Sequence, residues 1–396
     1  MSSGITTPRG FRAAGIAAGI KDEGRDLALI VADECCTAAG VFTRIAAVAA
    51  PVLVSRKHLS AGRARAIVVN SGCANAATGR AGLDDAREMV HLTATSLGCP
   101  PEEVLVASTG VIGVPLPMDR VRTGVSEAAG ALSRDHGTDV ALAIMTTDTR
   151  PKEASAELTL GGMPCVIGGV AKGAGMIAPN MATMLAFFTT DVAIEASLLH
   201  RALVSAVGES LNRITVDGDT STNDCAVVLA SGASGAAVVS DEGSDYDAFR
   251  LALTDVARRL AQMLVRDGEG VTRVAEVRVE GARTADEADR VARVVAESLL
   301  VKTALHGGDP NWGRVLAAAG RAGVKVRGDR VSIWIGDVWV AEGGVAREYQ
   351  EARAAAAMEE DPVLIKVHLG EGEATGWMWT SDLSHEYVSI NAHYRT

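Results

Sequence analysis

Short strand-like apolar runs, each closed by glycine or a polar turn, recur along the chain and alternate with helix patterns. The runs are "ARAIVVNSG" (64–72), "EVLVASTG" (103–110), "DCAVVLASG" (224–232) and "RVSIWIGDVWVAEG" (330–343). In the last run Gly336 and Asp337 mark the turn of a hairpin. Helix patterns lie between the runs, such as "LDDAREMVHLTATSLG", "SLLHRALVSAVGESLN" and "TADEADRVARVVAESLL". This alternation predicts an α/β (α+β) fold of packed helices and sheets.

The last of these helix patterns also bears on the domain organisation. One face of it carries apolar residues at helical spacing, which predicts that they face a core: Ala288, Val291, Val294, Val295 and Leu299. The polar stretch "EGARTADEAD" just before it is typical of a surface connection. We therefore expect a main domain over residues 1–280 and a smaller C-terminal α/β unit over residues 281–396.

Composition narrows the class of partner. The chain of 396 residues is 48% hydrophobic and carries a net charge of −11, with no basic block. This charge argues against nucleic acid or an anionic membrane as a partner and favours small molecules. No apolar run reaches the roughly 18 residues of a membrane span, and the start lacks the order of a signal peptide, so a cytoplasmic protein is expected. The six cysteines are scattered, which predicts reduced thiols and no zinc site.

Three motifs with known chemistry fail on their details. "GAGMIA" (173–178) fits a dinucleotide-binding pattern, but Pro179 and Asn180 follow where a helix should begin. "DGDTSTND" (217–224) lacks the glycine and the glutamate of a calcium-binding loop. His306 stands alone among glycines, which is more typical of a structural histidine than of a ligand. We expect neither a cofactor nor a metal.

The stretch "KGAGMIAPNMATMLAFF" places a threonine, Thr183, inside an apolar run. The ordinary interpretation is a strand threonine that bonds to the backbone. The glycine-rich, proline-fixed segment before it could instead hold the peptide bond between Ala182 and Thr183 under strain. An N-to-O acyl shift followed by hydrolysis would then free Thr183 as a new N-terminus. Its α-amine, with a pKa of about 8, could serve as the base for its own hydroxyl.

Several further motifs, taken together, resemble one known family over essentially the whole chain. They are "TPRGF", "NSGCANAATG", "ASTGVIG", "AIMTTDTRPK", "AKGAGMIAPNMATMLAFFTTD", "TVDGDTSTND", "VRDGEG", "VKTALHGGDPNWGR" and "YVSINAHYRT". In this collinear order the sequence is similar to the ornithine acetyltransferases, which are glutamate N-acetyltransferases of the cyclic arginine pathway. The resemblance implies a layered αββα sandwich of the ornithine acetyltransferase and DmpA-like kind.

The resemblance also implies that the precursor cleaves itself between Ala182 and Thr183, into an α chain of residues 1–182 and a β chain of residues 183–396. Thr183 matches the family's nucleophile. Thr109 and Gly110 match its oxyanion hole, where loss of one donor typically lowers turnover by about 10²- to 10³-fold.

The family's substrate-binding positions match Thr146, Lys172, Thr183, Glu269, Asn391 and Thr396. Lys172 suits a carboxylate and Glu269 suits an amino group. The implied reaction is ping-pong: Thr183 takes acetyl from N²-acetyl-L-ornithine and gives it to the amine of L-glutamate. Some family members also use acetyl-CoA as a co-substrate. The implied assembly is a heterotetramer of two α and two β chains.

Other functions stay open at this point. One is an N-terminal-nucleophile aminopeptidase or amidase of similar architecture, in which water resolves the acyl-enzyme. Another is an acyltransferase of secondary metabolism with the same fold and threonine. A third is a binding protein that keeps the fold and never cleaves.

Overall fold

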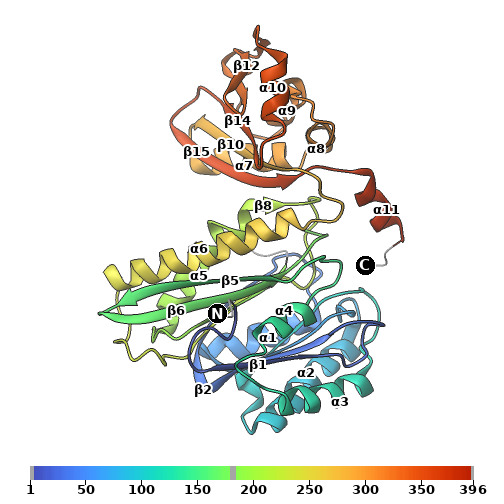
Figure 1. The fold of residues 1–396 in the computed structure, drawn as a ribbon, viewed down its shortest axis with the longest axis vertical. Helices are drawn as coiled ribbons and strands as arrows, with labels where there is room; N and C mark the ends of the chain where they lie inside the picture. Colours follow the sequence, from blue (N-terminus) through green and yellow to red (C-terminus); the bar gives the residue numbers. More distant parts are fainter. Residues whose placement is uncertain (1–3, 179–183, 394–396) are drawn as a thin grey trace. The chain divides into compact units, whose positions relative to one another are not determined.

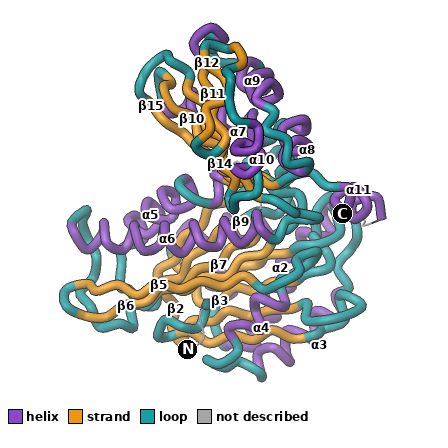
Figure 2. The backbone as a smooth tube through the Cα atoms, turned by 45° about the horizontal axis from the view of Figure 1, so that its top comes forward, coloured by secondary structure: helices purple, strands orange, loops and turns teal. Residues whose placement is uncertain are grey.

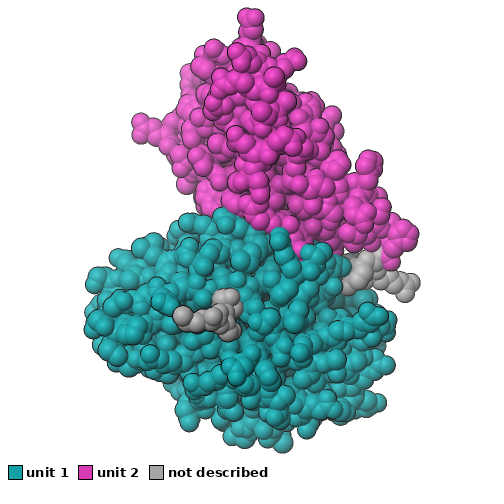
Figure 3. Space-filling view, in the orientation of Figure 1, with its two compact units in different colours: residues 1–212, 219–264, 395–396 teal, residues 213–218, 265–394 magenta. Residues whose placement is uncertain are grey.

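The computed structural model describes residues 4–178 and 184–393 and divides the chain into two compact units. Unit 1 is Met1–Asn212, Asp219–Leu264 and Arg395–Thr396, and unit 2 is Arg213–Gly218 and Val265–Tyr394; Figure 3 shows them in teal and magenta. The expected division into residues 1–280 and 281–396 stays a prediction.

Unit 1 is built on one eight-stranded sheet in the order β4-β3-β2-β9-β7-β6-β5, with β1 paired to β2. Its strands are β1 (Phe11–Ile16), β2 (Leu27–Phe42), β3 (Arg63–Asn70), β4 (Val104–Ser108), β5 (Lys152–Leu160), β6 (Met163–Lys172), β7 (Leu185–Thr190) and β9 (Cys225–Ala230). The predicted runs at 64–72, 103–110 and 224–232 are thus strands β3, β4 and β9.

The long strand β2 links two halves of this sheet. Its first part, from Leu27 to Ala32, pairs with β1 and with β3, whereas Thr37–Phe42 pairs with β9. Apolar side chains from both halves meet in one core, with Ile30 and Ile67 from one half and Phe187 and Leu229 from the other. The two halves therefore lie face to face as two inner β layers (Figure 1).

Helices cover the two outer faces of unit 1. They are α1 (Ala50–His58), α2 (Gly79–Leu97), α3 (Met118–Gly130), α5 (Ala196–Gly208) and α6 (Ser244–Arg266), whereas α4 (Gly137–Ala143) packs into the core between the β layers through Val140 and Ala141. Helices α2 and α3 pack on β1 to β4 through Met89 and Val121. On the other side α5 contacts β2 and β9, and α6 approaches Gly169 of β6 through Leu260 (Figure 2). The predicted αββα layering is confirmed.

Unit 2 holds a seven-stranded sheet in the order β13-β12-β11-β14-β10-β15-β8. The strands are β8 (Ile214–Thr215), β10 (Val274–Ala282), β11 (Ser332–Ile335), β12 (Val338–Glu342), β13 (Val345–Ala346), β14 (Val363–His368) and β15 (Ala374–Ser381). The helices are α7 (Ala285–Ala296), α8 (Leu299–His306), α9 (Trp312–Gly320), α10 (Glu351–Ala357) and α11 (His385–His393). The predicted hairpin is confirmed, because β11 and β12 pair antiparallel across Gly336.

The predicted apolar face of α7 is right except at its end. Ala288, Val291 and Val295 are buried and Val294 packs against the same core, but Leu299 is 63% exposed. Leu299 lies outside the stripe because α7 ends at Ala296 and Ser298 adopts an extended backbone that starts a new helix. Within residues 4–178 and 184–393, no helix has both the length and the apolar character needed to cross a membrane.

Candidate active site

Two loops that follow adjacent parallel strands are joined at Thr109 and Gly110. Strands β3 and β4 pair in parallel, so their carboxyl ends meet at one edge of the sheet. The Thr109 amide donates to the carbonyl of Asn70 (3.0 Å), and Cys73 bridges to Thr109. A Cβ added to Gly110, at φ 127°, would lie 2.3 Å from the carbonyl carbon of Gly72. Only glycine permits this approach, so the "STG" sequence fixes the loop locally.

Lys172 brings three of the predicted site residues into contact. It is the last residue of β6, and only 10% of its side chain is exposed. Its Nζ donates to the hydroxyl of Thr146 (2.6 Å) and to that of Thr109 (3.2 Å). An ammonium has donors only, so each hydroxyl oxygen accepts and keeps its own proton for another partner. The cluster therefore offers a cation and two hydroxyl donors in one place.

Asp148 organises the surroundings of this cluster, and the sequence did not reveal its role. Its side chain is completely buried. Oδ1 accepts hydrogen bonds from Lys152 Nζ (2.6 Å) and from the Gly173 amide (2.7 Å), and Oδ2 accepts one from the Thr146 amide (3.1 Å). Burial alone would raise the pKa of Asp148, but Lys172, Lys152 and these hydrogen bonds lower it to about 2. Asp148 is thus ionised at neutral pH.

Two further residues near the cluster come from the loop before β9. Asn223 is buried and its Nδ2 donates to the carbonyls of Ala74 (2.6 Å) and Ser108 (2.8 Å), which ties together both loops at Thr109. Complete burial raises the pKa of Asp224 well above its usual range, against the lowering effects of Ser221 and of the Lys172 charge. Asp224 is therefore favoured in its neutral form.

A second lysine reaches the same loop. Lys21 Nζ donates to the carbonyl of Met145 (3.0 Å), the residue before Thr146. Burial lowers the pKa of Lys21; Asp26 and Asp148 oppose this effect, whereas the Lys172 charge adds to it. The sequence signal for Lys21 was weak, because a lysine beside a glycine-rich stretch is usually a solvated surface residue.

Strand β7 begins beside Lys172. Leu185 pairs with Lys172 on β6 and with Cys225 on β9, and Met184 before it is buried. Phe187 and Phe188 are also buried. Ala182 and Thr183, the predicted cleavage site and nucleophile, lie outside the described residues.

Two of the remaining predicted residues, Glu269 and Asn391, belong to unit 2. Glu269 is 6% exposed, and its Oε2 accepts a hydrogen bond from Asn391 Nδ2 (2.7 Å). Asn391 lies on α11, which is held to the turn before β10 by the hydroxyl of Ser384, a donor to the Gly270 carbonyl (2.6 Å). Chain ends are usually frayed, so an ordered helix so close to the C-terminus was not expected, and α11 supplies that order. Thr396 lies outside the described residues.

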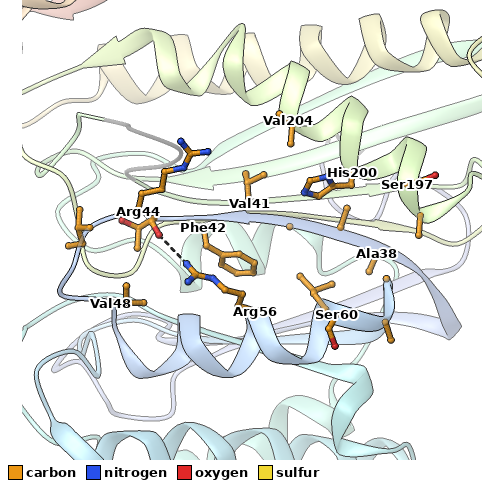
Figure 4. A pocket seen from close by; sticks show the side chains of 18 residues that line it. Ala38, Val41, Phe42, Arg44, Val48, Arg56, Ser60, Ser197, His200 and Val204 are labelled. Atoms are coloured by element: carbon orange, nitrogen blue, oxygen red, sulfur yellow. Dashed lines mark hydrogen bonds between the residues drawn. The ribbon is translucent and has the colours of Figure 1, made fainter.

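A large groove lies elsewhere in unit 1. This cavity of about 1040 Å³ is lined by residues of β2, α1 and α5, including Phe42, Arg56 and His200 (Figure 4). Arg56 there donates to the Thr43 carbonyl (3.1 Å). None of the predicted site residues within 4–178 and 184–393 lines the groove. In the described part of the chain no group of three or more His, Cys, Asp or Glu side chains is placed to hold a metal ion.

Comparisons with known proteins agree on one family. The model of the ArgJ family matches residues 12–396. The arginine biosynthesis bifunctional protein ArgJ of Symbiobacterium thermophilum is 49% identical over 399 residues, covering 100% of this chain and 99% of that protein. The protein of the same name from Geobacter sulfurreducens is 48% identical over 392 residues, covering 98% of this chain and 99% of that protein.

A solved structure gives a similar result. The crystal structure of the arginine biosynthesis bifunctional protein from Bacillus halodurans is 43% identical, with a TM-score of 0.51. The match covers 52% of this chain and 98% of that one.

Proposed function

Because this chain belongs to the ArgJ family, we propose that it is the acyltransferase that moves an acetyl group from N²-acetyl-L-ornithine to L-glutamate in arginine biosynthesis. The observation that carries the assignment of the site is the contact of the Lys172 ammonium with both Thr109 and Thr146. It joins a carboxylate-binding cation to the hydroxyl expected in the oxyanion hole.

The enzyme first matures by self-cleavage. The hydroxyl of Thr183 attacks the carbonyl of Ala182, and water hydrolyses the resulting ester, which leaves Thr183 with a free α-amine. This amine accepts the hydroxyl proton when the Thr183 oxygen attacks the acetyl carbon of N-acetylornithine. The C–N bond breaks and the proton passes to the departing amine of ornithine.

The second half of the reaction reverses these steps with another amine. The α-amine of glutamate attacks the acetyl-Thr183 ester, the C–O bond breaks, and the threonine oxygen recovers a proton. In both halves the negative oxygen of the tetrahedral intermediate faces the Thr109 hydroxyl and the Gly110 amide. Because Lys172 donates to the Thr109 oxygen, the hydroxyl proton is left for this oxyanion.

Binding must serve two amino acids with side chains of opposite charge. Both share the α-carboxylate, which suits Lys172 and Thr146. Glu269, fixed by Asn391, suits the cationic amino group of ornithine. A charged side-chain end buried without a partner would cost several kcal/mol, so the distal ends must reach polar groups or water.

The proposal also covers the subunit assembly, the cellular compartment and the cofactor requirement. Residues 1–182 and 183–396 form α and β chains that associate as a heterotetramer of two α and two β chains in the cytoplasm. The threonine chemistry requires no metal or cofactor, and acetyl-CoA, which some family members use, is a candidate second acetyl donor for glutamate.

Intact mass spectrometry of the purified protein, before and after brief exposure to N-acetylornithine, tests this function. We expect the masses of residues 1–182 and 183–396, and an added acetyl group on the second. Thr183→Ala should give one uncleaved, unacetylated chain. If the Thr183→Ala variant still became acetylated, Thr183 would not be the nucleophile. Ornithine release at a rate that does not depend on glutamate would indicate a hydrolase.

A further inference from the structure

Asp148 occupies an unusual place for a carboxylate. It lies in the loop between α4 and β5, and its side chain has no exposed surface. Placing an ionised carboxylate in such a site costs several kcal/mol unless charges and hydrogen bonds compensate. Here the compensation comes from Lys152, from the amides of Thr146 and Gly173, and from Lys172, whose Nζ lies 3.9 Å from Oδ2.

These partners join three parts of the candidate site. Lys152 begins β5 and Lys172 ends β6, and the two strands form an antiparallel hairpin in which Lys152 pairs with Ala171. Asp148 therefore closes the open end of this hairpin. Its bond to the Gly173 amide also fixes the chain as it leaves β6, and its bond to the Thr146 amide holds the threonine that accepts from Lys172.

We propose that Asp148 is a positioning residue that fixes the Lys172 ammonium and the Thr146 hydroxyl for the carboxylate shared by both substrates. The proposal rests on the function proposed above for Lys172. Asp148 does not touch the substrate in this scheme, because its side chain is enclosed by protein.

The charges around Lys172 support this role. Four titratable groups interact electrostatically with Lys172 or with Asp148 beside it: Lys21, Asp148, Lys152 and Asp224. Two of them are further cations. Of the two carboxyl groups, burial favours the neutral form of Asp224, whereas the lowered pKa of Asp148 keeps it ionised. Asp148 thus supplies negative charge that favours the protonated, binding-competent form of Lys172.

Asp148→Asn is the matched test, because it keeps the shape and removes the charge. In either orientation the new amide nitrogen faces donors: in place of Oδ1 it faces Lys152 and the Gly173 amide, and in place of Oδ2 it faces the Thr146 amide and Lys172. We expect the KM for N-acetylornithine and for glutamate to rise about tenfold to a hundredfold, the range of one charge-assisted bond, with a smaller change in kcat. The alkaline limb of kcat/KM should move to lower pH.

A second readout does not need enzymatic activity. Lys172 of the wild-type protein and of the variant is labelled competitively with an amine-reactive acetyl ester over a range of pH, and the peptide is quantified by mass spectrometry. We expect Lys172 of the variant to react at lower pH, because a buried ammonium that loses a carboxylate neighbour gives up its proton more readily. A wild-type protein without acetyl transfer would contradict the proposed function, while this labelling would still decide the role of Asp148.

Two further variants separate positioning from a general loss of stability. Lys152→Met removes the other lysine at Asp148 and should lower thermal stability while changing both KM values less than about threefold. If Asp148→Asn does not fold, Asp148→Asn combined with Lys152→Met removes both charges and should show the same shifts at Lys172. Unchanged KM values together with an unchanged labelling profile would overturn the proposal, as would equal KM effects for Lys152→Met and Asp148→Asn.

Discussion

The side-chain amide of Asn223 donates a 2.8 Å hydrogen bond to the carbonyl of Ser108, the residue directly before Thr109. The same nitrogen donates to the carbonyl of Ala74 (2.6 Å), in the loop after β3. One buried amide thus holds two loops whose conformations set the position of the predicted oxyanion hole.

Asn223→Leu should lower kcat about tenfold to a hundredfold with little change in either KM. The leucine has a similar size but no donor, so two buried carbonyls lose their partner and the Thr109–Gly110 segment shifts. Steady-state kinetics of both half-reactions measure the effect. Thr254→Val, which loses a partly buried hydrogen bond to the Arg250 carbonyl within α6, is the control and should keep kcat. A proportional rise of KM in Asn223→Leu would contradict a role in the transition state.

Thr109→Val should lower turnover by about 10²- to 10³-fold, because the oxyanion loses one donor. Lys172 keeps its bond to Thr146, so binding of the carboxylate should change less than turnover. Single-turnover formation of the acetyl-enzyme measures this loss. Thr95→Val, on the exposed face of α2, serves as the control. A variant that retained normal acetylation would exclude the Thr109 hydroxyl from the oxyanion hole.

Glu269→Gln and Asn391→Leu should each raise the KM for N-acetylornithine, and their effects should not add. The two side chains share a 2.7 Å hydrogen bond, and contacting residues typically couple by about 0.5 to 3 kcal/mol. A double-mutant cycle on kcat/KM provides the measurement, with Ser389→Ala on the same helix as the control. Fully additive effects would show that the two residues act independently.

Stability of unit 2 should depend on pH through Lys302. This lysine is buried, and burial lowers its pKa to about 8, against the opposing charges of Asp217, Asp382 and Glu297. Between about pH 8 and the ordinary lysine value, the unfolded chain binds the proton and the folded chain does not, so stability rises with pH. A difference of about 2.5 units corresponds to roughly 3 kcal/mol.

The thermal midpoints of wild type and Lys302→Met, compared from pH 7.5 to 10, measure this effect. The thermal midpoint of the wild type should rise relative to that of the variant as pH rises, because methionine does not titrate. Lys325→Met, which removes an exposed lysine of the same unit, should show a constant difference across this range. If the thermal midpoint of the wild type instead fell relative to that of Lys302→Met above pH 8, the expected sign would be wrong.

The sequence patterns predicted the strands and helices of the fold better than the neighbours of the site, and the αββα layering was implied by the family resemblance. Alternating strand and helix patterns are local, so β3, β4, β9 and the β11–β12 hairpin could be read from them. Leu299 was misplaced because a break at Ser298 depends on one backbone angle that periodicity does not show.

Asp148 and Asn223 show why the rest of the site could not be predicted. Asp148 is enclosed by a lysine four residues along the chain and by Gly173, 25 residues away. Asn223 bonds carbonyls 115 and 149 residues away. Polar residues of this kind are usually solvated, and only the folded chain shows that these two are buried and fully engaged.

The position of β7 has a consequence for biosynthesis. It lies between β6, which precedes the predicted cut, and β9, which follows it, and β9 in turn pairs with β2. Neither product of the cut therefore contains a complete sheet, and each would expose unpaired strand edges if made alone. The chain must therefore fold before it is cut. Two halves translated separately would be prone to aggregate, whereas a single precursor produces both chains in equal amounts and already in contact.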